Sequence, residues 1–520
     1  MKDSRQISRL KLGLRLGRCV MATLLSILIA HSHGENGTVP QQKLRPAGVA
    51  GSFYPAEPAA LTAMMDSMLA KASVPAINDR ILAVVAPHAG YPYSGPVAAY
   101  TYGALKGHHF SRVVVIAPSH FEAFDFTSVY DGDAYVTPLG AVLVDKEFAQ
   151  RLSKLAPSIR LSERGHMATA QGAEHALEVQ LPWLQHVLGS FSLIPIIMGD
   201  QSYEASRALG VSLAKLLEEQ KETADATLIV ASSDLSHYHS YDDAVKLDHN
   251  TLNALQAWDY LSMSRNFEMR VWEACGGAPI VAAMIAAERL GANRAQVLRY
   301  ANSGDTAGDH SRVVGYGAAI FVKSHGETVK KVPFSLNEQE KTYLLALAQK
   351  SVERAVQGHK AYVPDAVRDD VLNQERGAFV TLKIGGDLRG CIGYTSATEP
   401  LYLTVRDTAT LAALRDPRFQ PVSSSELSKL QYEISVLSPL RHVIDIKGIT
   451  VGKDGLLMRN GMHEGLLLPQ VPVEQHWDRI RFLRETCVKA GIPPNCWQDD
   501  DTDIFRFTAV VFGGTSPNMN

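Results

Sequence analysis

Histidine, aspartate and cysteine side chains stand at the ends of several apolar segments of this sequence. Three predicted strands end in such residues, and a glycine-containing loop before a predicted helix adds a cysteine: His88, His120, Asp234 with His237, and Cys275. In an α/β sheet, ligands bind outside the carboxyl ends of the strands, so we expect these side chains to lie together. Neutral imidazole and thiolate are ligands for zinc, iron or copper. We therefore predict a metal held by His88, His120 and Cys275, with positions left open for water or substrate.

Asp234 and His237 are expected to lie beside this metal, in the segment SSDLSHY. One of the two side chains could orient a ligand, and the other could act as a general acid or base. A single histidine after a strand is more often a hydrogen-bonded turn residue. An Ala-Pro pair precedes both His88 and His120, however, and this recurrence favours a shared site.

Two further segments are expected near the site. Tyr91 and Tyr93, in APHAGYPYSG, are predicted to line its cleft. Glu174, His175 and Glu178, in GAEHALEVQLPW, are predicted to begin a helix, with His175 and Glu178 on one face. These three residues either face the site or form the acidic first turn that a helix dipole favours.

The elements that must position these residues alternate between strand and helix over residues 44–323. Short apolar segments near residues 81–88, 112–120, 191–200, 226–238 and 312–322 read as strands, with helical patterns between them. This alternation predicts a layered α/β domain with a largely parallel sheet. A polar linker is expected at 324–333. A separate α+β domain is then expected at 334–514, with a helix opened by a Ser or Asn cap.

The second domain contains one segment that could carry chemistry, LRGCIGY, on the second strand of a hairpin turned by Gly-Gly-Asp. Arg389 could lower the pKa of the Cys391 thiol and make it reactive. Alternatively Cys391 is a small buried residue in a tight strand, which we slightly favour. The nearby LRDPRF is either an anion-binding turn or a capped helix end.

Composition limits the classes of function. The chain has 520 residues, 20% of them charged, and a formal net charge of −3, so nothing in the overall charge favours nucleic acid as a partner. The five cysteines do not form CxxC pairs. We therefore expect isolated thiols rather than a disulfide framework.

The first forty residues differ from the rest of the chain. Six Lys or Arg in residues 1–18 are followed by twelve uncharged residues and then a polar stretch. This layout is typical of a secretory signal, and its apolar segment is short for a membrane span. A cleaved signal, an uncleaved anchor and a dispensable extension remain open. Localisation is exported or membrane-anchored if the signal is real, and otherwise cytoplasmic.

Six motifs resemble the Memo family: VAGSFYP, APHAGYPYSG, APSH, AEHALEVQLPWL, SSDLSHY and CGGAPI, across about residues 47–322. The resemblance implies a fold similar to class III extradiol dioxygenases, which hold non-haem iron. It places His88, His120 and Cys275 on the metal-ligand positions, and Asp234 and His237 on the adjacent pair. The dioxygenases have Glu where this chain has Cys275, which argues against ordinary extradiol cleavage.

The segment from about residue 336 to about residue 513 resembles the AMMECR family. The motifs that carry the resemblance are LRGCIGY, LRDPRF, YEISVLSPL, GLLLPQVPVEQHWD and AGIPPNCW. The chain is thus similar to a fusion of two components of the AmmeMemoRadiSam system. The resemblance implies a separate radical S-adenosylmethionine protein as partner, since no CxxxCxxC motif occurs here.

Three functions follow from these expectations. The first is a metal-dependent redox enzyme, dioxygenase-like, using iron, with copper or zinc as alternatives, on an unidentified small molecule or macromolecule. The second is a binding or scaffold protein that keeps the cleft without catalysis. The third is a hydrolase in which His237 is the base toward a metal-activated water.

Overall fold

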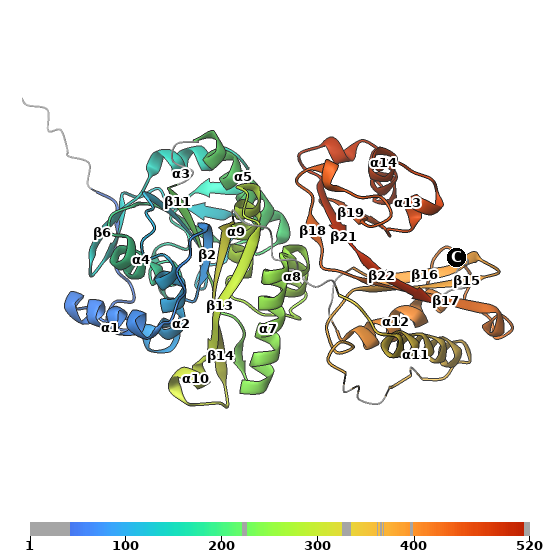
Figure 1. Ribbon diagram of the computed structural model, residues 1–520. Coiled ribbons are helices and arrows are strands. Elements are labelled where there is room, and N and C mark those ends of the chain that lie inside the picture. The colour runs from blue at the N-terminus through green and yellow to red at the C-terminus, as the bar shows by residue number, and fades with distance from the viewer. Residues whose placement is uncertain are drawn as a thin grey trace, which may run out of the picture. The chain divides into compact units, whose positions relative to one another are not determined.

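The computed structural model describes residues 42–220, 226–324, 334–360, 362–364, 367, 369–395 and 399–513 (Figure 1). The chain from Lys43 onward is one compact unit. The predicted signal at residues 1–40, and residues 325–333 of the predicted linker, lie outside the described residues. None of the described helices is both long and apolar enough to cross a membrane.

A nine-stranded mixed sheet forms the centre of the first domain, in the order β12-β14-β2-β11-β3-β10-β4-β7, with β13 paired to β14. Its strands are β2 (Arg80–Ala86), β3 (Arg112–Pro118), β4 (Thr127–Val129), β7 (Ile159–Leu161), β10 (Ser192–Met198), β11 (Thr227–Ser232), β12 (His237–His239), β13 (Arg294–Asn302) and β14 (Val313–Lys323). The four central strands β2, β11, β3 and β10 are parallel. β14 and β4 pair antiparallel with them. The predicted parallel sheet is therefore correct at the centre, and the outer pairings are mostly antiparallel.

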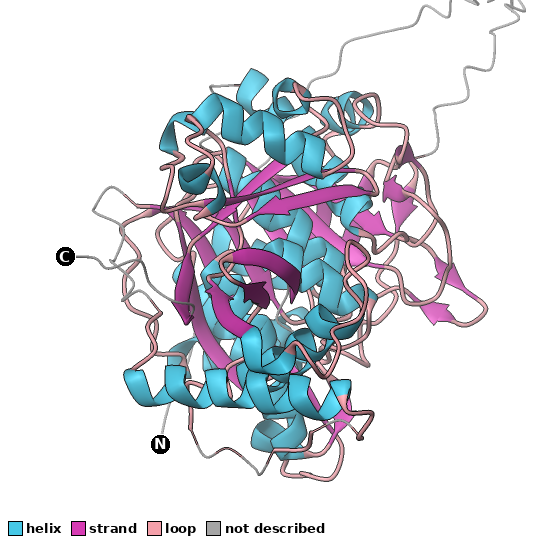
Figure 2. Ribbon diagram, turned by 90° about the vertical axis from the view of Figure 1, so that its right-hand side faces the viewer, coloured by secondary structure: helices cyan, strands magenta, loops and turns pink. Residues whose placement is uncertain are grey.

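Helices lie on both sides of this sheet, which is why its central strands are apolar throughout. The helices are α1 (Pro58–Lys71), α2 (Tyr91–Ala104), α3 (Lys146–Leu152), α4 (Gln180–Leu188), α5 (Tyr203–Glu219), α7 (Tyr241–Ala257), α8 (Tyr260–Glu268), α9 (Gly277–Arg289) and α10 (Ser303–Ala307). In β3, Val114 and Ile116 enter one core cluster, whereas Val113 and Val115 enter another. This alternation is the two-residue period of a strand buried on both faces. Figure 2, seen from the right-hand side of Figure 1, shows helices in cyan above and below strands in magenta.

A long excursion between β3 and β10 was not predicted. It contains β4, α3, β7 and four short strands, β5 (Ala134–Thr137), β6 (Gly140–Leu143), β8 (Ala168–Thr169) and β9 (Gly172–Ala173). β5 also pairs with β1 (Leu44–Arg45), so the start of the described chain joins this excursion.

The second domain has two four-stranded sheets and is α+β, as predicted. The first, β16-β15-β17-β22, comprises β15 (Ala378–Ile384), β16 (Asp387–Tyr394), β17 (Leu430–Leu437) and β22 (Ala509–Gly513). The helices α11 (Glu338–Val356) and α12 (Leu401–Leu414) share a core with it. Asn337 caps α11, as expected. The turn between β15 and β16 has positive φ angles at Gly385 and Gly386, which suits a tight hairpin.

The second sheet has the order β18-β21-β19-β20, from β18 (Arg441–His442), β19 (Gly455–Asn460), β20 (His463–Leu467) and β21 (Asp503–Phe507). The helices α13 (Val471–Glu474) and α14 (Arg479–Lys489) and the short helices η1 (Leu427–Lys429), η2 (Ile446–Gly448) and η3 (Cys496–Gln498) complete the domain. Residues 503–513 are two strands in two different sheets.

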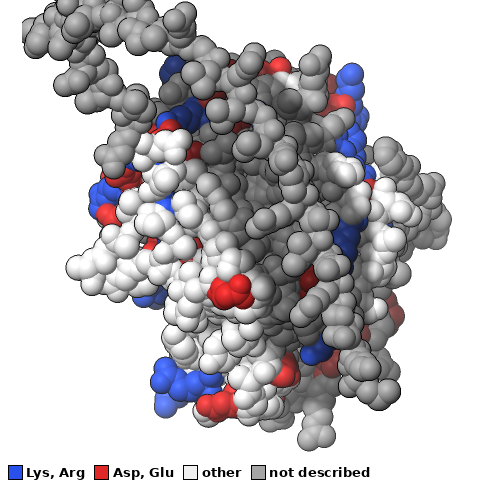
Figure 3. All heavy atoms as spheres, turned by 90° about the vertical axis from the view of Figure 1, so that its left-hand side faces the viewer, with Lys and Arg blue, Asp and Glu red and all other residues white. Residues whose placement is uncertain are grey.

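Charged side chains are mixed on the surface. On the face seen in Figure 3, blue and red side chains occur in small separate groups among white ones, where grey atoms do not cover them. This distribution agrees with the balanced formal charge of the chain.

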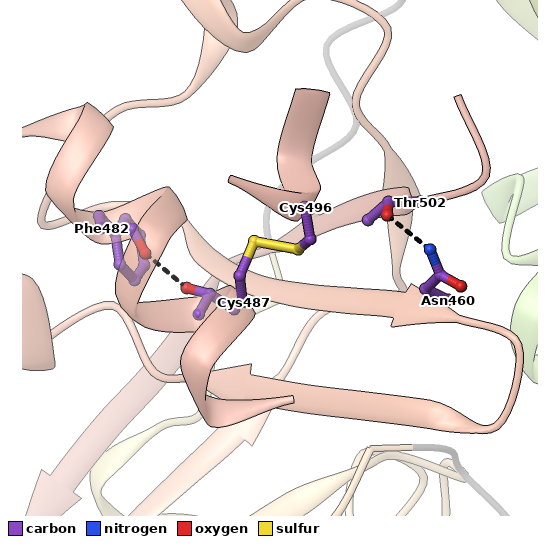
Figure 4. The surroundings of a disulfide bond; sticks show 6 residues. Asn460, Phe482, Cys487, Cys496 and Thr502 are labelled. Atoms are coloured by element: carbon purple, nitrogen blue, oxygen red, sulfur yellow. Dashed lines mark hydrogen bonds between the residues drawn. A yellow bond between two sulfur atoms is a disulfide. The ribbon is translucent and has the colours of Figure 1, made fainter. Parts of the chain in front are cut away.

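A disulfide bond joins Cys487, in α14, to Cys496, in η3 (Figure 4). Both residues are buried, and the chain reverses between them at Gly491, which has a φ of 76°. The expectation of isolated thiols is wrong for this pair, because the reversal brings together two cysteines whose spacing matches no familiar motif. Cys275 and Cys391 are free among the described residues.

We expect the disulfide to stabilise the second domain. Its cysteines are 9 positions apart, and closing a loop of this size in the unfolded chain is worth about 2–3 kcal/mol. The free energy of unfolding of the double variant Cys487→Ser/Cys496→Ser should therefore be lower by that amount. Its midpoint of urea unfolding should fall accordingly. Dithiothreitol should lower the midpoint of the wild type to that of the variant. An identical midpoint with and without dithiothreitol would show that the bond does not contribute.

Candidate metal centre

Three predicted site residues follow the ends of neighbouring parallel strands. His88 lies two residues after β2, His120 two after β3, and Asp234 two after β11. Cys275 reaches the same place from the loop between α8 and α9. Close approach of this loop requires glycine at position 276, since a Cβ there would lie 2.1 Å from the Ser232 carbonyl oxygen.

The side chains of His88, His120 and Cys275 converge. Their potential ligand atoms all lie within 4.8 Å of one another. The Cys275 sulfur is 3.0 Å from Nε2 of His88, and the two imidazole centroids are 5.2 Å apart. His175 is also close, with its ring centroid 4.7 Å from that of His120. His120, Glu174 and His175 form a second, overlapping group of potential ligands.

The hydrogen bonds of Ser232 fix the tautomer of His88. A hydroxyl has one proton, and Ser232 donates it to the Ala176 carbonyl at 2.6 Å. The contact of 2.9 Å between Ser232 Oγ and His88 Nδ1 must then be donated by Nδ1–H. In the neutral imidazole, Nε2 therefore carries the lone pair, and Nε2 is the nitrogen that faces Cys275.

Glu174 fixes His120 in the same way. Its carboxylate accepts hydrogen bonds from the backbone N–H of His120 at 2.6 Å and from Nδ1 of the same residue at 3.0 Å. Burial opposes ionisation of Glu174, but the hydrogen bonds from His120 and from the Ala176 N–H outweigh it and lower the carboxyl pKa. An ionised carboxylate only accepts, so His120 also presents Nε2 as its free lone pair. Carboxylates commonly orient metal-binding histidines in this way.

The electrostatics of the cluster favour neutral imidazole. Burial, and then the neighbouring imidazoles of His120, His175 and His237, lower the pKa of His88 well below its ordinary value. Burial, and then the nearby Asp234 carboxyl, raise the pKa of the Cys275 thiol. A thiolate at this position therefore needs a cation beside it. A divalent metal ion would supply that charge, so the donor set fits a metal.

Asp234 holds two of these residues through backbone groups. Its carboxylate accepts from the N–H of His88 at 2.7 Å and of Ala89 at 3.3 Å, and its own N–H donates to the Cys275 sulfur at 3.2 Å. Burial raises the carboxyl pKa to about 6, against the opposing effect of the His88 N–H. The carboxylate thus orients the loop that carries His88.

His237 lies beside the cluster, at the start of β12. Its Nδ1 is 2.8 Å from the Leu235 carbonyl oxygen, which can only accept, so Nδ1 carries the proton and Nε2 is the basic nitrogen. His237 and Cys275 both line a pocket of about 310 Å³, together with Trp272 and Glu273. His239, at the end of β12, pairs with Glu273 at 2.9 Å.

Two expectations near the site are wrong. Glu174, His175 and Glu178 precede α4, which begins at Gln180. The helical face expected for His175 and Glu178 is therefore absent. Glu178 is fully buried and pairs with Arg45, and it also accepts from the N–H groups of Gly48 and Val49.

Tyr91 does not line a cleft. It is 1% exposed, donates its hydroxyl to the Val179 carbonyl at 2.8 Å, and packs on Trp183. Tyr93 is 48% exposed, and its place at the cleft stays a prediction.

The LRGCIGY segment forms β16, and its motif residues have packing partners. Arg389 pairs with Glu426 at 2.7 Å and is not among the groups that shift the pKa of Cys391. Burial raises that thiol pKa against the opposing effects of Thr381 and Arg418, so activation by Arg389 is not supported. A Cβ at Gly390 would lie 2.2 Å from the Ala412 carbonyl oxygen, so this glycine lets α12 pack against the strand. Cys391 is half-buried, and the interpretation as a structural cysteine in a tight strand fits it better than the reactive-thiol interpretation.

The LRDPRF segment is the end of α12 and is tied to β16. Asp416 accepts from the Cys391 N–H at 2.8 Å, and from the Arg418 N–H at 3.0 Å and guanidinium at 2.7 Å. The hydrogen bond from Arg418 lowers the pKa of Asp416 to about 2. Arg418 is therefore paired internally and holds this turn to β16, so it is not a free cation for an anion, whereas Arg415 is exposed.

Asp416 should therefore make the second domain sensitive to acid. Its folded pKa lies below the ordinary value of 3.8, so its contribution is complete above pH 3.8 and is lost as the pH falls toward 2. Asp416→Asn should lower the free energy of unfolding by about 1 kcal/mol at neutral pH, because water screens the ion pair with the 45% exposed Arg418. Urea unfolding from pH 7 to pH 2.5 should show the two proteins converging in acid. A constant difference across this range would contradict the assignment, and Asp407→Asn, on α12, is the matched control.

Comparisons with known proteins agree with the two-domain division. A family model described as Memo-like protein matches residues 45–320, and one described as AMMECR1 matches residues 345–512. The MEMO1 family protein MK0963 of Methanopyrus kandleri is 36% identical over 286 residues, which is 53% of this chain and 98% of that protein. A MEMO1 family protein of Sulfolobus acidocaldarius is 36% identical over 293 residues, or 54% of this chain and 99% of that protein.

A solved structure is also similar in sequence. Uncharacterized Protein PH0010 from Pyrococcus horikoshii is 39% identical, covering 35% of this chain and 96% of that one, with a TM-score of 0.34. The Memo-like match extends over more than half of the chain and includes every residue of the cluster described above. The chain therefore belongs to the Memo-like protein family and carries an AMMECR1 domain after its Memo-like domain.

Proposed function

We propose that the Memo-like domain binds one transition-metal ion through His88, His120 and Cys275 and carries out metal-dependent redox chemistry at the open side of that ion. The observation that carries this proposal is the convergence, within 4.8 Å, of two imidazoles with fixed tautomers and one thiol. Three protein ligands leave positions for water or substrate, as catalytic metal sites do.

Iron is the metal we favour, by the resemblance to extradiol dioxygenases, with copper or zinc as alternatives. All three accept imidazole and thiolate ligands. When bound, iron or copper would supply redox chemistry, and zinc would supply Lewis-acid activation. Cys275 in place of a carboxylate ligand argues against ordinary extradiol cleavage, because a thiolate changes the electronic properties of the metal.

The residues around the ligands have separate tasks in this proposal. Asp234 is a positioning residue, because it accepts from the His88 N–H and donates its own N–H to Cys275. His237 is the candidate acid or base. Its Nε2 can hold or move a proton, since Nδ1 donates to the Leu235 carbonyl, and its side chain shares a pocket with Cys275.

Elemental analysis of protein purified without added metal tests the site. We expect bound iron or copper in the wild type, and its loss from His88→Ala, His120→Ala and Cys275→Ser. Ser232→Ala, which removes the partner that fixes the His88 tautomer, should weaken metal affinity by about ten-fold. Cys391→Ser is the matched control for Cys275→Ser, because Cys391 is the other free thiol among the described residues. Unchanged metal content in the three ligand variants would refute the metal site.

The same proteins separate the three functions. Oxygen consumption by iron-loaded but not zinc-loaded protein supports redox chemistry. Hydrolytic activity that survives zinc loading and is lost in His237→Asn supports the hydrolase. Binding without turnover, unchanged in the ligand variants, supports a scaffold.

We also propose that the chain acts with a separate radical S-adenosylmethionine protein. The presence of both Memo-like and AMMECR1 domains supports this, as does the lack of a CxxxCxxC motif in the sequence itself. Fusing the two domains also holds them at high effective concentration. Co-expression of a radical protein from the same genome should yield a complex that co-elutes under anaerobic conditions. Independent elution at micromolar concentration of both proteins would contradict the partnership.

A further inference from the structure

The carboxylate of Glu375, in the AMMECR1 domain, accepts a hydrogen bond from the loop that carries Cys275. Trp272 lies in this loop, between α8 and α9, and is 5% exposed. Its indole Nε1–H donates to Oε2 of Glu375 at 3.1 Å. The other oxygen of Glu375 accepts from Nδ2 of Asn250, in α7, at 2.9 Å. Glu375 lies within the residues that match AMMECR1, whereas both donors lie within the Memo-like match.

Trp272 is also a shared wall of two cavities. It lines the pocket of about 310 Å³ that contains His237 and Cys275. It also lines a cavity of about 670 Å³ between the two domains, with Asn250 and Glu375 among its other walls. A displacement of the indole would therefore alter the surroundings of the candidate metal centre as well as the interdomain cavity.

Trp272 is one of several points that hold the loop, together with Glu273, which pairs with His239 and accepts from the His237 N–H. Arg270 has a φ of 57°, a left-handed conformation that a non-glycine residue keeps only when its neighbours enforce it. At the other end, the Gly276 N–H donates to Ser233 Oγ at 3.0 Å, and the Asp234 N–H donates to the Cys275 sulfur. Only two residues, Glu273 and Ala274, separate Trp272 from Cys275, so the indole and the thiol lie close together along the chain.

Trp272 is buried, whereas Glu375 and Asn250 are half-buried beside the cavity of about 670 Å³. Burial raises the pKa of Glu375, and the hydrogen bonds from Trp272 and Asn250 oppose that effect. The two donors therefore compensate the carboxylate charge. Removing the carboxylate would leave a buried indole N–H and an amide without this acceptor, and such groups tend to move until they find another partner.

We propose that Glu375 is a positioning residue for the candidate metal centre, acting through Trp272 on the Cys275 loop. The AMMECR1 domain thereby completes the Memo-like site without contributing a ligand to it. The inference rests on the proposed role of Cys275 as a metal ligand. It adds that the geometry of this ligand depends on a residue about one hundred positions away, in the other domain.

The test compares Glu375→Leu and Glu375→Gln with the wild-type full-length chain. Glu375→Leu removes both carboxylate oxygens, and the leucine side chain is similar in size to the glutamate side chain. We expect iodoacetamide to alkylate Cys275 several-fold faster in the metal-free variant, measured peptide by peptide by mass spectrometry, with the Cys391 rate unchanged. Affinity for added Fe²⁺, measured by chelator competition, should fall by about ten-fold. Glu375→Gln should restore both values in large part, because its amide oxygen can accept from Trp272 while Asn250 rotates its own amide.

Glu204→Leu is the matched control. Glu204, in α5, also makes a contact across the two domains, an ion pair with Arg459 at 2.8 Å, and it lies in a different helix from the Cys275 loop. This variant should leave Cys275 alkylation and Fe²⁺ affinity unchanged. Equal Cys275 alkylation in Glu375→Leu and wild type would overturn the inference, as would an equal effect of Glu204→Leu. If Glu375→Leu unfolds, the alkylation rate of Cys391 rises as well. The ratio of the Cys275 rate to the Cys391 rate in Glu375→Gln, compared with the wild type, then decides whether the inference holds.

The alkylation result is independent of the metal. If the wild type binds no Fe²⁺, the proposed function fails. Faster Cys275 alkylation in Glu375→Leu would still show that the second domain positions the loop. If Fe²⁺ binds with equal affinity to the wild type and Glu375→Leu, the metal site stands and the positioning role falls.

Discussion

The parallel pairing of β2, β11 and β3 is the constraint on which the candidate site depends. Ala86 of β2 is paired with Ser232 of β11, and Ala231 of β11 with Ile116 of β3. This register places the residues that follow each strand at one edge of the sheet. A slip by one residue would turn every side chain of a strand to the opposite face, so the apolar cores on both sides fix the register. The convergence of His88, His120 and Asp234 is thus a consequence of core packing.

Buried polar side chains next to the potential ligands are held in fixed orientations by their hydrogen bonds. Gln180 donates to Ser232 Oγ at 2.7 Å and to the Pro87 carbonyl at 3.1 Å, and the Tyr102 hydroxyl donates to its amide oxygen. That contact sets the orientation of the amide, so Gln180 presents N–H groups to Ser232. Ser232 must then send its single proton to Ala176, which leaves only an acceptor for His88. The tautomer of the imidazole is therefore decided two hydrogen bonds away from it, and the site is organised before any ligand arrives.

The sequence predicted the convergence of side chains that directly follow a strand with a strong apolar pattern. The apolar strands, the recurring Ala-Pro before His88 and His120, and the Asn337 cap were all readable, because each depends on residues close together in the chain. The short strands between residues 127 and 173 were not, since two to four residues are too few to show a period. Tyr91 was misplaced because its hydroxyl finds a carbonyl across the core, at Val179. Such long-range pairings leave no local signal.

The disulfide and the contact between Trp272 and Glu375 also left no local signal in the sequence. The disulfide bears on the cellular compartment of the protein. A buried bond between Cys487 and Cys496 forms and persists most readily in an oxidising compartment. The secretory signal expected at residues 1–40 would agree with such a compartment, and it stays a prediction. A radical enzyme with an iron–sulfur cluster belongs, in contrast, to reducing surroundings. An exported chain would therefore meet such a partner only before export, whereas the proposed metal centre would act afterwards, with the reductant and substrate of that compartment. The redox state of Cys487 and Cys496 in protein taken directly from cells thus discriminates between these two settings for the same site.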